Sequence, residues 1–105
     1  MEDGQIEPAV EYFHRVTELD PDLPLPQAAV GTFLVNRGEL EEGRERLETA
    51  LRLAPDLPEA HFGMGRYWKA VGDIEKARQE FEFVMRSDAK PWLTAEARRE
   101  LQDLE

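Results

Sequence analysis

The chain has 105 residues, of which 23 are acidic and 13 are basic, so its formal net charge is −10. It lacks cysteine, which excludes disulfide scaffolds, thiolate metal sites and cysteine nucleophiles. The acidity argues against a nucleic-acid partner, no apolar run approaches the roughly 18 residues of a membrane span, and the first residues lack the features of a signal peptide.

A 34-residue repeat runs through most of the chain. Segments 24–57 and 58–91 are identical at seven of 34 positions, and most of the others keep their apolar or polar character. When the repeats are aligned, positions 34 residues apart fall in one column. Glycine recurs in two such columns: one holds Gly4, Gly38 and Gly72, and the other holds Gly31 and Gly65. Such a period indicates one supersecondary unit that is stacked along a solenoid.

The first predicted element is a single helix within 4–23. Gly4 supplies the turn before it, and six apolar positions are expected to face inward: Ile6, Ala9, Val10, Phe13, Val16 and Leu19. This segment matches only the second half of a repeat unit. We therefore expect a fragment of a longer array, in which the unpaired helix promotes weak self-association through its apolar side.

The next two elements are helix pairs in 24–57 and 58–91. In the second pair, Pro58 suits a first helical position and Gly72 suits the left-handed turn after a helix. Asp73 is placed to cap the second helix of that pair. Segment 24–57 shows the same arrangement.

The last predicted element, in 92–105, is a capping helix with one apolar stripe formed by Leu93, Ala97, Leu101 and Leu104. The whole chain, 1–105, is thus predicted to be a single all-α domain of six helices.

The period and its columns resemble the tetratricopeptide repeat over residues 4–91. Val30-Gly31 and Met64-Gly65 occupy the Leu-Gly columns, Gly43 and Ala77 the small column, Leu47 and Phe81 the second aromatic column, and Pro21 and Pro55 the terminal proline column. Gln27 and His61 depart from the pattern because they replace its first aromatic residue. The resemblance implies an α-α superhelix of antiparallel helix pairs that acts as a protein–protein interaction module.

The resemblance also implies a concave groove, lined by the first helix of each pair, that binds a peptide or a partner helix. The positions expected to face it are Ala28, Thr32, Val35, Phe62, Arg66 and Lys69, with Leu25 and Glu59 near the rim. Phe62 is placed to anchor an apolar side chain of the ligand. Arg66 and Lys69 have two interpretations: they pair with a ligand carboxylate, or they are ordinary surface cations near Glu59 and Asp73.

One branch of the family uses Lys and Asn in these columns to clamp the C-terminal carboxylate of chaperones. Here the asparagine columns hold Ala29 and Gly63, and the lysine column holds Ala28 and Phe62. Binding of chaperone tails is therefore not expected. Residues 1–23 carry seven acids and one base, which describes either a solvated helix face or a docking surface for a basic segment.

No catalytic, metal or cofactor site is predicted. Glu11 and His14 form one Glu-x-x-His pair, whereas a di-iron bundle needs two such pairs and two further glutamates. His61 is interpreted as a partly buried packing residue, and Phe83 is expected to point toward solvent or a neighbouring chain. The alternatives that stay open are a structural spacer in a larger array and an accessory domain of a larger enzyme. The absence of cysteine fits the cytoplasm, which is favoured, and the periplasm.

Overall fold

The computed structural model describes residues 8–105, which form six α-helices. They are α1 (Pro8–Leu19), α2 (Pro24–Asn36), α3 (Leu40–Leu53), α4 (Pro58–Val71), α5 (Ile74–Arg86) and α6 (Pro91–Asp103). No strand occurs in this range, so the predicted all-α class is confirmed for it. Gly4 and Ile6, which were assigned to the first helical segment, lie outside the described residues.

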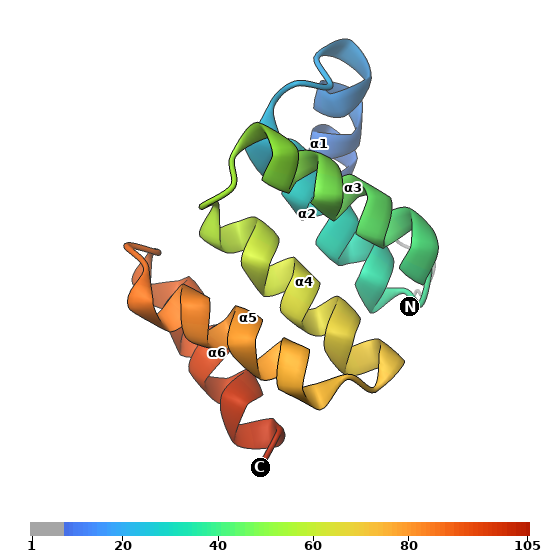
Figure 1. The fold of residues 1–105 in the computed structure, drawn as a ribbon. Helices are drawn as coiled ribbons and strands as arrows, with labels where there is room; N and C mark the ends of the chain where they lie inside the picture. Colours follow the sequence, from blue (N-terminus) through green and yellow to red (C-terminus); the bar gives the residue numbers. More distant parts are fainter. Residues whose placement is uncertain (1–7) are drawn as a thin grey trace.

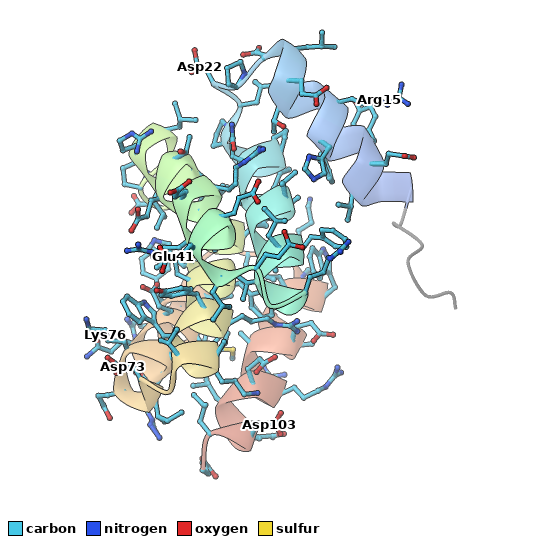
Figure 2. All side chains as sticks on the ribbon, turned by 90° about the vertical axis from the view of Figure 1, so that its right-hand side faces the viewer. Arg15, Asp22, Glu41, Asp73, Lys76 and Asp103 are labelled. Carbon is cyan, nitrogen blue, oxygen red and sulfur yellow. The ribbon has the colours of Figure 1, made fainter. Side chains whose placement is uncertain are left out.

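Two helix pairs, α2 with α3 and α4 with α5, make up the centre of the molecule (Figure 1). Helices α2 and α4 lie side by side, and α3 contacts both of them. Figure 2 shows α3 and α5 on one side of α2 and α4, with α1 and α6 on the other side. None of the described helices is long and apolar enough to cross a bilayer.

The helix ends follow from a few local signals. Gly38 and Gly72 have φ values of +87° and +90°, a left-handed conformation that disfavours residues with a Cβ atom. At the end of α4, the Gly72 N–H donates to the Lys69 carbonyl and the Asp73 N–H donates to the Trp68 carbonyl, the bond pattern of a Schellman motif. Asp73 then caps α5, as predicted, because its Oδ1 accepts the Lys76 N–H at 3.1 Å.

Two clusters of buried side chains form the core. The first joins α2, α3 and α4 and contains Ala28, Val35, Leu47, Ala50, Ala60, Met64 and Tyr67. The second joins α4, α5 and α6 and contains Phe62, Ala77, Phe81, Val84, Leu93 and Ala97. Trp68 packs against both clusters, so the two helix pairs share one continuous core.

Two orientations predicted for apolar residues are wrong. Leu19 is 87% exposed, because the inward position at the end of α1 belongs to Thr17, which donates to the His14 carbonyl and accepts from Arg46 Nη1. Phe83 does not point freely to solvent, since its ring stacks on the His61 ring with 3.9 Å between centroids.

Candidate ligand groove

A groove of about 450 Å³ lies between α1 and α6, with α2 and α4 as its floor. Most of its lining is apolar. The lining residues are Val10 and Phe13 from α1, Leu25, Ala28, Ala29, Thr32, Phe33 and Asn36 from α2, Glu59 and Phe62 from α4, and Lys90, Trp92 and Leu93 at the start of α6. Helices α3 and α5, which lie on the other side of α2 and α4 from α1 and α6 (Figure 2), contribute no residue to the groove.

Half of the predicted groove positions lie in this groove. Ala28, Thr32 and Phe62 line it, although Ala28 is fully buried and Phe62 also belongs to the core. The other three positions, Val35, Arg66 and Lys69, lie in an adjacent pocket of about 360 Å³ that Asn36, Ala70 and Glu100 complete. The structure therefore divides the predicted concave surface into an apolar groove and a charged pocket.

The sequence interpretation missed the contributions of α1 and α6 to the groove wall. Leu93 could have been found by extending the 34-residue offset beyond residue 91, because it corresponds to Glu59 and Leu25, the residues predicted near the rim. The same extension makes α6 the first helix of another unit. The apolar spacing predicts that Val10 and Phe13 face inward, but it does not predict that they line a groove. Their part in it depends on where α1 packs, which no local pattern specifies.

Arg66 and Lys69 bind carboxylates of α6, and not Glu59 and Asp73, beside which the surface-cation interpretation placed them. Lys69 Nζ lies 2.8 Å from Glu100 and 3.6 Å from Asp103, the residue labelled near the end of α6 in Figure 2. The hydrogen bond to Glu100 raises the pKa of Lys69 above its ordinary value, while partial burial opposes that rise.

Arg66 lies in the same cluster and makes four contacts. Its Nε lies 3.1 Å from Glu100 and its Nη2 lies 3.8 Å from Glu96. Its Nη1 donates to Asn36 Oδ1 at 3.1 Å, and its guanidinium lies 4.9 Å from the centroid of the Phe62 ring.

The partners of Arg66 and Lys69 follow the repeat. Phe62, Arg66 and Lys69 correspond at an offset of 34 to Glu96, Glu100 and Asp103. Residues at equivalent repeat positions of α4 and α6 thus contact each other where the two helices meet. In this ion-pair cluster two cations face three carboxylates, so its net charge is −1 and both cations are already paired within the protein.

The columns that would hold a carboxylate clamp contain no side-chain donor. Ala28 is fully buried, and Gly63 faces Thr32 and Leu47 so closely that a side chain would collide with both. In this position glycine permits α4 to approach α2 and α3. The clamp positions therefore serve packing.

The two histidines lie on different helices, each with its own set of neighbours. His14 lies on α1 in a surface depression with Glu11 and Glu18, and the described residues contain no group of three potential metal ligands. Both ring nitrogens of His61 are engaged within the protein, by Glu80 and by the Pro55 carbonyl. His61 is therefore a structural residue in this conformation.

Comparison with known proteins identifies the fold. No protein-family profile matches the sequence, and no curated protein matches it. Among solved structures, the chain is similar to the first tetratricopeptide-repeat domain of Spaghetti (RPAP3) bound to the HSP90 peptide SRMEEVD. The TM-score is 0.71 at 17% identity, over 91% of this chain and 74% of that chain. The chain thus has the helical-repeat fold of a tetratricopeptide domain.

Proposed function

We propose that this helical-repeat domain is a protein–protein interaction module that binds a peptide or a partner helix in the groove between α1 and α6, without catalysing a reaction. The observation that carries the proposal is the groove itself, whose lining is mainly apolar although it is open to solvent. Its rim holds two exposed apolar side chains, Leu25 (43% exposed) and Trp92 (59% exposed). Exposed apolar surface of this kind is typical of binding sites.

The ligand chemistry that fits the groove is a segment with a bulky apolar side chain. Phe33, Phe62 and Trp92 offer aromatic surface, while Thr32 and Asn36 offer a few polar atoms. Aromatic side chains in such a setting carry much of the binding energy at protein interfaces. Glu59 and Lys90, one of each sign, are the charged residues of the lining, so the groove itself has no net charge.

The matched pair Leu25→Ala and Leu53→Ala tests the site. The probe is a synthetic peptide selected by the wild-type chain from a random phage-displayed library. We expect Leu25→Ala to weaken binding of this peptide by roughly fivefold, and Trp92→Ala by tenfold or more, because both truncations remove groove surface. Affinity is measured by isothermal titration calorimetry.

Leu53→Ala is the control, because Leu53 is 39% exposed but lies at the end of α3, outside the groove. It should bind the peptide as the wild type does. Equal affinities for Leu25→Ala and Leu53→Ala would place the binding site elsewhere. If the library yields no binding peptide at all, the structural-spacer alternative is favoured.

A second prediction concerns the acidic peptide SRMEEVD, which binds the similar domain of RPAP3. We expect no measurable binding of this peptide to the present chain at about 100 μM. The reason is that Arg66 and Lys69 are already paired with Glu96, Glu100 and Asp103. Saturable binding at lower concentration, lost in an Arg66→Ala variant, would show that α6 releases these cations to a ligand.

A further inference from the structure

The His61 ring joins three parts of the molecule. It extends from α4, its Nε2 lies 2.7 Å from the Pro55 carbonyl oxygen in the turn before α4, and its Nδ1 lies 2.7 Å from Glu80 Oε1 on α5. The Phe83 ring of α5 stacks on it. The His61 and Glu80 side chains are partly buried, at 17% and 23% exposure, so the access of water to the contact between them is restricted.

The two partners of the ring require both of its nitrogens to carry a proton. A carbonyl oxygen only accepts hydrogen bonds, so Nε2 must donate to Pro55. In the neutral ring, Nδ1 would then present a lone pair to an ionised Glu80 oxygen, and two acceptors would face each other at 2.7 Å. Only the imidazolium donates to both partners.

The preceding helix pair contains an equivalent set of contacts whose side chains do not titrate near neutral pH. At an offset of 34, Gln27 corresponds to His61, Pro21 to Pro55 and Arg46 to Glu80. Gln27 Nε2 donates to the Pro21 carbonyl at 2.9 Å, and Gln27 Oε1 accepts from Arg46 Nη1 at 3.4 Å. The amide supplies one donor and one acceptor, and each meets its complement at any pH near neutral.

We propose that His61, Glu80 and the Pro55 carbonyl form a pH-sensitive clasp. The clasp holds α5 and the α3–α4 turn to α4 when the imidazole is protonated and loosens when it loses its proton. This inference does not depend on the proposed ligand groove. It rests on the arrangement of donors and acceptors around the ring and on the comparison with Gln27.

The charged groups around the ring favour the protonated state. They are both carboxylates: Glu80 on α5, and Asp56 in the turn before α4. Burial alone would lower the pKa of His61, but the hydrogen bonds to Glu80 and Pro55, with the charges of Glu80 and Asp56, outweigh burial and raise that pKa above 6.5.

The sign of the pH dependence follows from this shift. Because the pKa is higher in the folded chain than in the unfolded chain, the clasp stabilises fully below about pH 6.5. Its contribution is lost as the pH rises through the folded-state pKa of His61.

The substitution Glu80→Gln tests the clasp with almost no change of shape. A glutamine amide at position 80 can donate to Nδ1, so it satisfies the neutral ring while Nε2 still donates to Pro55. We expect the NMR titration midpoint of the His61 ring to lie above 6.5 in the wild type and to fall in Glu80→Gln. Urea unfolding measures the free energy of unfolding at each pH. We expect this free energy to fall more in the wild type than in Glu80→Gln as the pH rises from about 6 to about 9.

The control is Glu82→Gln, which removes the same charge from an exposed position on α5. It should retain the wild-type midpoint and the wild-type pH dependence of stability. The double variant His61→Gln/Glu80→Arg copies the contacts of the preceding pair and should fold without this pH-dependent loss. A wild-type midpoint at or below about 6.5, or equal pH dependence in wild type and Glu80→Gln, would overturn the proposal.

Discussion

Replacing Phe81 by alanine is expected to lower the free energy of unfolding by about 3–5 kcal/mol. Phe81 is fully buried in the cluster that joins α4, α5 and α6, and its ring meets the Phe62 ring edge-on with 5.5 Å between centroids. Its removal would leave a cavity that helices on three sides cannot close. A domain of this size has a total stability of about 5–15 kcal/mol, so the loss is a large fraction.

The measurement is urea unfolding, followed by circular dichroism at 222 nm, where α-helices give a strong negative signal. Tyr12→Ala is a suitable control because it also removes an aromatic ring, from a residue that is 64% exposed on α1. It should change stability by less than about 1 kcal/mol. A loss of less than about 1 kcal/mol in Phe81→Ala as well would show that α5 and α6 do not pack on α4 as described.

Gly65→Ala is expected to lower the free energy of unfolding by about 1–3 kcal/mol, although alanine is the better helix former. A Cβ atom at position 65 would lie 2.6 Å from Cε1 of Phe81 and within 3 Å of two more atoms of that ring. The ring is enclosed and cannot move away, so α4 and α5 would have to separate. Chemical unfolding of the single variant measures this cost.

In the Phe81→Ala background, Gly65→Ala should instead raise the free energy of unfolding. With the ring absent, the three atoms nearest to the new Cβ atom are gone, and the gain in helix propensity of up to about 1 kcal/mol is expressed. The double-mutant cycle therefore separates a steric requirement for glycine from a loss of backbone freedom. If Gly65→Ala is equally destabilising in both backgrounds, contact with Phe81 is not the reason for glycine at this position.

Much of the fold could be predicted from local signals. The all-α class, the turns at Gly38 and Gly72 and the cap at Asp73 each depend on a few neighbouring residues. The period of 34 residues then relates these elements to one another. Leu19 was misplaced because apolar spacing does not show where the packing of α1 against α2 ends.

The candidate site was less predictable because it depends on which helices meet. The partners of Arg66 and Lys69 come from α6, about 30 residues further along the chain, whose apolar stripe predicts only a capping helix. Phe83 was misplaced for a similar reason, because its partner His61 lies on the opposite helix of the pair. Both errors concern contacts between elements, which residue spacing within one element does not encode.

The most direct test of the ligand groove is to map a selected peptide onto the chain by NMR. Amide chemical shifts are followed while the peptide is added to the labelled protein. The proposed site predicts that the largest changes fall at the groove surface of α2 and α4 and at the start of α6, around Thr32, Phe62 and Trp92. Changes concentrated on α3 and α5, which contribute no residue to the groove, would contradict it.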